Sequence, residues 1–300
     1  VSVHELAHAL EADVEVDDCG PQLRPHGARQ TSSDDFARGA VAPLADQGHI
    51  VVTGDDARVF LHSQLTNDVA GLSDGVSMLA GYCSAKGRLL GSMRVWSDSE
   101  GIHLMPSRVL AAGLTRRLSM FVLRAKARIQ DRSNQSVCFG LSGSAARPAL
   151  EALQIAWPEA GTVRSGGSLH AVGLESLALE KGSVGRALLW CPVERAREVW
   201  DQLCETLAPV SSIDWRWTEV MSGIPRITGA GVERFVPQMV NLDLVGGVSF
   251  RKGCYPGQEV VARSHYLGKL KRRMFAAHLE GTPPSAGSDL FDADGAEPCG

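Results

Sequence analysis

One short segment of this chain concentrates side chains that can do chemistry. Residues 251–259 place the thiol of Cys254 two residues after Lys252, and Gln258 and Glu259 follow closely. Nearby cations favour a thiolate, so Cys254 is the best candidate for a reactive sulfur. A surface turn with a half-buried cysteine explains the same residue types equally well.

Two glycines bracket this thiol. Gly253 and Gly257 let the backbone take a positive φ or let a ligand approach closely. Pro256 fixes one torsion and prevents a regular helix through the turn. The segment is therefore expected to form a tight loop that presents Cys254.

The composition limits the class of protein. The chain has 300 residues, of which 44% are hydrophobic, so it can form two or three domains with a substantial core. No run approaches the roughly 20 apolar residues of a membrane span, and we expect no membrane partner. The formal net charge of -4 gives no electrostatic attraction to bulk nucleic acid, so no direct nucleic-acid partner is expected.

The cysteines argue against structural cross-links. There are seven, an odd number, and no pair has the spacing C-x-x-C. A disulfide framework and a tetrahedral zinc site are both disfavoured, and no metal site is predicted. Reduced thiols fit a cytoplasmic location.

Apolar periodicity indicates strands that alternate with helices. Residues 48–52 are typical of a strand, and Thr53 and Asp56 have capping-box-like spacing before a helix with an apolar face. The absence of a glycine-rich loop between a strand and a helix leaves NAD and ATP sites without support. The other expected elements are paired strands within 76–96, a helix over 110–121, a strand within 122–131, a helix through 149–153, a strand at 187–190, a helix over 193–207 and a strand starting at Trp215.

Several ordered segments resemble one protein family. Residues 252–259 resemble the K-G-C-[FY]-x-G-Q-E signature of the YgfZ family, folate-binding relatives of the T-protein (aminomethyltransferase) of the glycine cleavage system. Four segments upstream resemble further motifs of that family, so that the resemblance covers roughly residues 45–275. They are residues 60–69, 83–88, 235–242 and 246–250.

The resemblance implies an α+β fold. Two intertwined ferredoxin-like lobes would enclose a central folate pocket, followed by a small C-terminal β-barrel that is incomplete, and therefore truncated, in this chain. The expected divisions are a weakly ordered or variable leader over 1–40, the folate-binding region over 41–268 and the start of the barrel over 269–300.

The resemblance also implies a cofactor and its contacts. Tetrahydrofolate or a derivative would bind non-covalently, and Cys254 would be the functional thiol, able to hold an iron–sulfur cluster transiently. For Glu259 the likelier role is to tie down the loop, and each arginine serves a salt bridge between lobes equally well. The predicted folate-binding residues are Gln238, Asn241, Lys252, Gly253, Tyr255, Gly257, Gln258, Glu259, Arg226 and Arg263.

One departure from the T-protein bears on the reaction. A catalytic aspartate of the T-protein follows the turn that corresponds to Lys86 and Gly87, whereas this chain has Gly91 and Ser92 there and no carboxylate until Asp98. The resemblance therefore favours a folate-binding accessory protein for iron–sulfur cluster assembly or repair, including clusters of tRNA-modifying enzymes, rather than a classical enzyme. Its partners would be a reduced folate and iron–sulfur assembly or client proteins.

Two other classes of function stay open. One is a folate-dependent one-carbon transferase, similar to aminomethyltransferase, that uses another acid or base. The other is an interaction module whose pocket no longer binds a ligand. Folate binding separates the last class from the first two, and turnover of an aminomethyl or methyl donor identifies a transferase.

Overall fold

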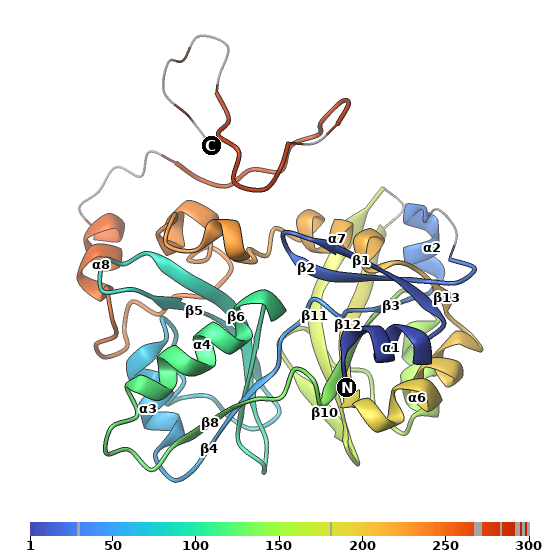
Figure 1. Ribbon diagram of the computed structural model, residues 1–300, viewed down its shortest axis with the longest axis horizontal. Helices are drawn as coiled ribbons and strands as arrows, with labels where there is room; N and C mark the ends of the chain where they lie inside the picture. The colour runs from blue at the N-terminus through green and yellow to red at the C-terminus, as the bar shows by residue number, and fades with distance from the viewer. Residues whose placement is uncertain are drawn as a thin grey trace.

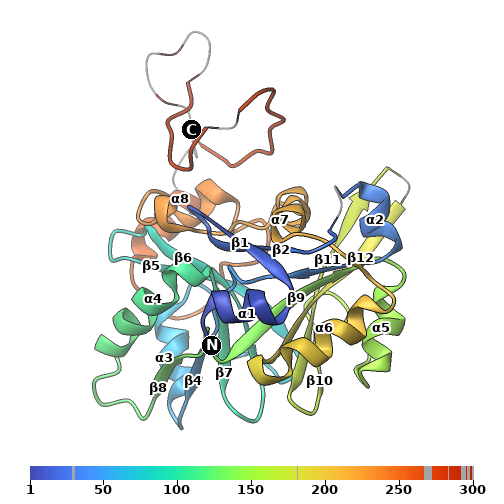
Figure 2. The same ribbon diagram turned by 45° about the vertical axis from the view of Figure 1, so that its right-hand side comes forward.

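The computed structural model is an α+β fold built on two large sheets that lie side by side (Figure 1, Figure 2). It describes residues 1–28, 31–180, 182–266, 272–282, 284–291, 295 and 298. The α+β class expected from the sequence is confirmed, and the described strands form no closed barrel. No helix in this part of the chain combines the length and the apolar character needed to cross a membrane.

The first lobe is an antiparallel five-stranded sheet with two helices, α3 (Ala57–Gln64) and α4 (Arg108–Met120). Its central strand, residues 102–106, is buried along its whole length, and Ile50, Val51 and Val52 of the neighbouring strand are buried as well. In spatial order the strands are β5 (Ser77–Cys83), β6 (Leu89–Ser97), β7 (Ile102–Pro106), β4 (Ile50–Thr53) and β8 (Arg128–Asp131).

The predicted capping box at the start of α3 is wrong. Asp56 occupies the N-cap position but makes no side-chain cap hydrogen bond. Its Oδ2 instead accepts a hydrogen bond of 2.7 Å from the backbone N–H of Lys126. The carboxylate therefore fixes the loop before β8, a long-range contact that local spacing does not reveal. That loop also confines the strand expected within 122–131 to its last four residues.

The second lobe is a six-stranded sheet that carries the helices α5 (Ala146–Ala152), α6 (Ala196–Cys204) and α7 (Ser212–Met221). The 3-10 turn η1 (Val193–Arg195) precedes α6, so the regular helix is shorter than the predicted 193–207. In spatial order the strands are β10 (Val163–Gly166), β11 (Leu169–Leu179), β12 (Gly182–Pro192), β9 (Ser136–Ser142), β3 (Ala40–Pro43) and β13 (Ala208–Pro209).

The N-terminal segment is part of the second lobe, which corrects the expectation of weak order over 1–40. Leu6, Leu10 and Leu23 are at most 6% exposed and join the core of that lobe. Strand β3 then lies between β9 and β13 and pairs with both, so β13 joins the sheet only through β3. The N-terminal elements are α1 (Val3–Ala9), β1 (Ala12–Asp17), β2 (Gly20–Pro25) and α2 (Ser33–Arg38).

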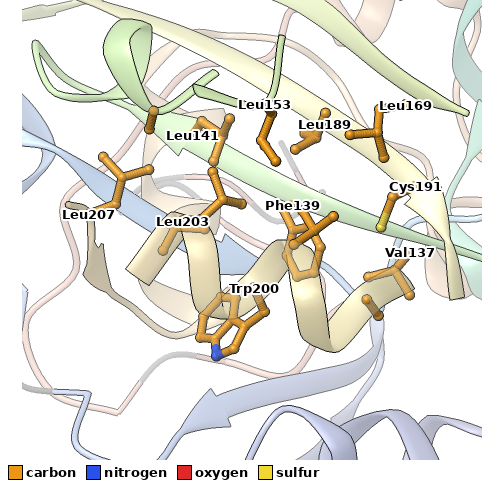
Figure 3. Packing of buried hydrophobic residues seen from close by; sticks show 14 of the residues in the cluster. Val137, Phe139, Leu141, Leu153, Leu169, Leu189, Cys191, Trp200, Leu203 and Leu207 are labelled. Carbon is orange, nitrogen blue, oxygen red and sulfur yellow. The ribbon is translucent and has the colours of Figure 1, made fainter. Parts of the chain in front are cut away.

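The core of the second lobe lies between its sheet and its helices (Figure 3). Phe139 of β9 stacks on Trp200 of α6, with ring centroids 5.7 Å apart. Leu203 and Leu207 extend this contact from the helix side, and both are at most 2% exposed. Aromatic and aliphatic burial of this kind supplies most of the stabilisation of such a lobe.

The strand predicted at Trp215 is wrong, because Trp215 lies in α7. Ser211 caps this helix, and its Oγ accepts a hydrogen bond from the N–H of Asp214 at 3.1 Å. In a strand Trp215 and Trp217 would share one face, whereas on a helix they point in different directions. Trp215 is buried in the core, and Trp217 stacks on Phe36 near the surface.

The remaining described elements are the 3-10 turns η2 (Gly229–Gly231) and η3 (Pro237–Val240) and the helix α8 (Gln258–Tyr266). After α8 the described residues contain no helix or strand. The barrel predicted to start at 269 is therefore not confirmed, and residues 267–271 lie outside the described part of the chain.

We predict that Gly140→Ala destabilises the protein and that Gly113→Ala does not. A Cβ on Gly140 would lie 2.6 Å from ring atoms of Trp215, whereas Gly113 in α4 has no neighbour within 4 Å. Overpacking should lower the unfolding free energy of the first variant by about 1–3 kcal/mol. The helix position should gain about 0.5–1 kcal/mol. Denaturant titration measures both values, and equal stabilities would contradict the packing described for α7.

Candidate functional site

A cavity lies between the two lobes and receives side chains from both. Strands β6 and β7 line it from the first lobe, and β11, β12 and α7 line it from the second. The chain that follows α7 covers its remaining side. The lining residues are Gln47, Leu79, Ser92, Met93, Arg94, Met105, Leu174, Glu175, Arg186, Leu188, Glu219, Ser222, Ile224, Pro225 and Arg226.

Two arginines enter this central cavity from facing sheets. Arg94 of β6 pairs with Glu175 of β11, with 2.9 Å between Nη2 and Oε2. Arg186 of β12, only 2% exposed, donates to neutral oxygens, the carbonyls of Glu175 and Thr218 and the Thr218 hydroxyl. Burial lowers the pKa of Arg186 to about 10, so the residue stays charged at neutral pH. The cavity thus contains a buried cation that meets no carboxylate in these contacts.

Arg226 is the third arginine of the cavity. Its Nη2 lies 2.7 Å from Asp46 and 3.1 Å from Glu219. Burial raises the pKa of Glu219, although Arg226 opposes the shift. Within the described structure Arg226 Nη1 is buried and has no hydrogen-bond partner. This unused donor can serve an acceptor atom of a ligand at little further desolvation cost.

Ser92 stands where the T-protein resemblance calls for an acid. Its Oγ donates to the carbonyl of Pro225 at 2.9 Å and accepts from the N–H of Ile227 at 2.9 Å. Both hydrogen bonds hold the chain on either side of Arg226 against β6. Ser92 therefore positions Arg226, and no carboxylate occurs at 91–92.

The cysteine loop lies before α8 and presents Cys254 to the surface. Of the six cysteines among the described residues, Cys254 is the exposed one, and Cys83, Cys138 and Cys191 are buried. Burial raises the pKa of the Cys191 thiol to about 12 and that of Cys138 well above its ordinary value. Exposure thus distinguishes Cys254, as the sequence predicted.

Lys252 anchors the loop through hydrogen bonds to the backbone of the first lobe. Its Nζ donates to the backbone carbonyls of His62 and Leu65, the latter at 2.7 Å, at the end of α3. It also lies 4.9 Å from the ring centroid of the buried Tyr255, a cation–π contact. Burial lowers the pKa of Lys252 to about 8. The cation therefore ties the loop to the first lobe.

Two glycines bring the cysteine loop against residues 83–88. Gly257 has a φ of +78°, and a Cβ there would lie 2.4 Å from the carbonyl oxygen of Ser84 and 2.5 Å from the Cα of Gly87. A Cβ on Gly87 would in turn meet Val260 at 2.8 Å. Glycine is required at 257 because two backbones cross without room for a side chain.

The other predicted folate contacts support the loop and α8. Gln238 Nε2 donates to the carbonyl of Val261 at 2.7 Å, and Asn241 Nδ2 donates to that of Met274 at 2.8 Å. Glu259 and Arg263 form an exposed pair, 2.6 Å apart. Gly253 of the loop is exposed, and Gln258, the first residue of α8, is half-buried. Of the predicted set only Arg226 lines the central cavity, and the folate contacts of the others stay predictions.

The sequence analysis missed Arg94, Glu175, Arg186 and Glu219. A usable signal existed for the two arginines, because each interrupts a strongly apolar strand. A charged residue inside such a strand is rarely buried without a specific partner. The glutamates gave no comparable signal. Among the described residues no group of three or more His, Cys, Asp or Glu side chains has the arrangement of a metal site.

We predict that Gly257→Ala destabilises the protein more than Gly246→Ala does. Both positions have a positive φ, and alanine should cost each about 1–2 kcal/mol. Gly246 has no neighbour within 4 Å, so only Gly257→Ala adds the collision with backbone atoms. Thermal unfolding of the two variants separates the two effects. Equal losses would show that the loop does not cross residues 83–88 as described.

Comparison with known proteins gives a consistent picture. No family model matches the chain. It is 33% identical over 269 residues to the tRNA-modifying protein YgfZ of Klebsiella pneumoniae (strain 342), covering 89% of this chain and 80% of that protein. It is 34% identical over 251 residues to the protein of that name from Edwardsiella ictaluri (strain 93-146), covering 82% and 73%.

A solved structure shares the fold. The glycine cleavage system aminomethyltransferase T from Bartonella henselae superposes with a TM-score of 0.70 over 88% of this chain and 73% of that chain. At 16% sequence identity this likeness concerns the fold alone. The curated relatives show that the chain belongs to the YgfZ family, and the solved structure shows that it shares the fold of aminomethyltransferase T.

Proposed function

We propose that this protein binds a reduced folate in the central cavity and takes part in tRNA modification by supporting the iron–sulfur clusters of tRNA-modifying enzymes. The observation that carries the proposal is the buried, unused Nη1 of Arg226 in a cavity between the lobes. The names of the curated relatives support a role in tRNA modification. The T-protein fold supports a folate as the ligand.

The cavity offers the groups that a pterin and a glutamate tail require. A pterin edge carries hydrogen-bond donors and acceptors, which a carboxylate and a guanidinium can match. Glu175 supplies the carboxylate, Arg94 and Arg186 supply donors, and Arg226 supplies a further donor for the ring or the tail. An arginine fork suits the carboxylates of the tail.

Ligand entry requires side chains of the cavity to move. The cavity has a volume of about 80 Å³, which is small for a pterin ring. Met93 and Met105 line it, and methionine repacks at low energetic cost. We propose that these two residues rearrange when the ring system enters.

We further propose that the two sheets are the two ferredoxin-like lobes of the T-protein superfamily. The spatial order β6-β7-β4-β8, with α3 and α4 as the crossovers, supports this assignment for the first lobe. In the second lobe the corresponding strands are β11, β12, β9 and β13. Strand β3 lies inside that sheet, which supports the intertwined connectivity.

Binding without aminomethyl transfer is the form of the proposal that the site supports best. General acid–base catalysis requires a titratable group aimed at the reacting atoms. The hydroxyl of Ser92 is committed to Pro225 and Ile227 and is not a substitute for the missing acid.

We predict that calorimetry detects tetrahydrofolate binding and that Glu175→Gln weakens it. Loss of a charge-assisted hydrogen bond costs about 1.5–3 kcal/mol, which corresponds to about tenfold to a hundredfold in the dissociation constant. Glu159→Gln is the matched control, because Glu159 is exposed and pairs only loosely with Arg147 at 3.8 Å outside the cavity. Absence of heat with any reduced folate, or equal loss in both variants, would refute the cavity as the site. Formation of methylene-tetrahydrofolate from the aminomethyl carrier would instead identify a transferase.

We predict that Cys254 is the fastest cysteine to be alkylated in the native protein. Its rate should exceed that of the other five cysteines in the described part of the chain by at least about tenfold, because those five are buried or half-buried. Cys254→Ala should keep the unaltered melting temperature and folate affinity yet fail to restore iron–sulfur enzymes in a deletion strain. Cys204→Ala, a half-buried cysteine of α6, should restore them fully. Mass-spectrometric mapping and the activity of a tRNA-modifying iron–sulfur enzyme provide the readouts. Full restoration by Cys254→Ala would make the loop a structural turn.

A further inference from the structure

A second polar groove lies between the lobes, apart from the central cavity and the cysteine loop. Five of its lining residues, His49, Asp98, His103, Ser136 and His170, carry groups that exchange protons or hydrogen bonds. His49 is 8% exposed and His103 only 1% exposed. Neither the folate proposal nor the thiol uses any of these residues.

Four of the groups form a continuous chain of short contacts. Ser136 Oγ lies 2.8 Å from His49 Nδ1, and His49 Nε2 lies 2.9 Å from His103 Nδ1. His103 Nε2 lies 3.0 Å from Asp98 Oδ1. We call this series from Ser136 to Asp98 the histidine relay. Each internal contact joins two ring nitrogens or a nitrogen and an oxygen that can be either donor or acceptor.

The carboxylate sets the direction of the protons in the relay. Asp98 Oδ1 accepts from the backbone N–H groups of Glu100 and Gly101, at 2.8 and 3.2 Å, and the pKa of Asp98 is held well below its ordinary value. An anionic oxygen 3.0 Å from His103 Nε2 favours a proton on that nitrogen through charge, although the pair lacks the geometry of a hydrogen bond. His103, when neutral, then accepts at Nδ1 from His49 Nε2–H, and His49 accepts at Nδ1 from the Ser136 hydroxyl.

The same heavy atoms also accommodate one additional proton. With both ring nitrogens of His103 protonated, the bonds toward Ser136 reverse, and His49 donates to the serine oxygen. The serine hydroxyl then turns to the carbonyl of Arg132, which lies 3.2 Å away. Both arrangements give Ser136 and His49 a hydrogen-bond partner, so the relay can accommodate a proton on His103 without moving its side chains.

The relay crosses the lobe interface. His103 belongs to β7 and His49 immediately precedes β4, so both are in the first lobe. Ser136 begins β9 of the second lobe, and His170 of β11 approaches Asp98 from that lobe at 3.7 Å. Aromatic rings also meet across the interface, because the ring centroids of His49 and Trp190 are 4.9 Å apart, with the two planes tilted by 40°.

The surrounding groups keep His49 uncharged. Burial is the largest cause that lowers the pKa of His49 to about 3, and the charges of His103, Arg132 and His170 lower it further. Burial also lowers the pKa of His170. The other charged or titratable groups that line the groove are Asp98, Glu100, which pairs with Arg132 at 2.6 Å, Cys191 and Glu194.

The relay is adjacent to the central cavity through one layer of side chains. Trp96 stacks on His103 at 4.8 Å, and Trp190 Nε1 donates to Met105 Sδ at 3.2 Å. Met105 lines the central cavity. A change in the hydrogen bonds of the relay therefore reaches the cavity wall through Trp190 and Met105.

We propose that the histidine relay is a proton-sensitive latch that joins the two lobes, with its proton order fixed by Asp98. Its neutral state, in which Ser136 donates to His49 and His49 donates to His103, is the closed latch. Acidification opens it through His49, because burial disfavours a second proton on this ring, and lobe separation or unfolding allows the ring to take it up. The proposal stands independently of which ligand the central cavity binds.

The first test determines the tautomers of the histidines in the unaltered protein. Long-range proton–nitrogen correlation spectra with labelled histidine should show His49 and His103 in the single Nε2–H form at pH 7, with His49 neutral down to about pH 4. His49→Gln identifies the His49 signals. A protonated Nδ1 on neutral His49, or titration of His49 near its ordinary pKa of 6.5, would overturn the relay.

The second test measures coupling between its two ends. Ser136 and Asp98 lie in different lobes, and the rings of His49 and His103 connect them. The effect of replacing one of them on stability should therefore depend on whether the other is present. The unfolding equilibrium constant of the Ser136→Ala, Asp98→Asn double variant should differ at least about twofold from the product of the two single effects. Ser144→Ala is the matched control for Ser136→Ala, because the Ser144 hydroxyl donates to the backbone carbonyl of Arg38 in the second lobe. In the Ser144→Ala, Asp98→Asn double variant the unfolding equilibrium constant should change by the product of the two single effects. Multiplication in both pairs would contradict the latch.

The third test uses pH. The folded pKa of His49 lies below its unfolded value, so stability is lost as pH falls from about 6.5 toward about 3. Each proton taken up on unfolding raises the unfolding equilibrium constant about tenfold per pH unit. His49→Gln should reduce the number of protons taken up on unfolding by about one. An unchanged slope in His49→Gln would overturn the proposal, and if that variant does not fold, the spectra of the unaltered protein decide alone.

Discussion

Charges buried between the two sheets are the constraint on which the rest of the structure depends. Arg226 cannot be removed from water unless carboxylates meet it, and it meets Asp46 and Glu219. Asp46 comes from the loop after β3, and Glu219 comes from α7. The ion pairs therefore fix the position of the chain after α7 over the cavity. Ser92 then attaches that chain to the first lobe.

The cysteine loop is positioned by backbone approach rather than by charge. Gly87 and Gly257 bring two distant segments so close that neither tolerates a side chain. Lys252 adds the tie to the end of α3 through two carbonyl groups. The motif at residues 252–259 thus combines one exposed thiol with residues that mainly hold the loop in place.

The interface between the lobes is layered. The central cavity forms one layer, the contacts of Trp96, Trp190 and Met105 form the next, and the histidine relay forms the last. Neighbouring layers share residues of β7, because His103 and Met105 lie two positions apart on the same face of that strand. Cavity and relay are therefore parts of one packed interface, although their sequence motifs are unrelated.

The sequence by itself determined the family, the α+β class, the exposed thiol and most of the elements of the first lobe. Short sequence patterns predict these features because they depend on neighbouring residues. The apolar run 50–52 indicates a buried strand, and the glycine at 257 indicates a backbone that can take a positive φ. Only the tertiary structure decided which residues meet in the cavity and the relay. His49 and Ser136 are 87 residues apart, and no periodicity encodes their contact. Trp215 is a further example. The alternation of Trp215 and Trp217 is compatible with a strand, but the cap at Ser211 starts a helix, and the ring of Trp215 packs against Gly140, where a side chain would leave no room for it.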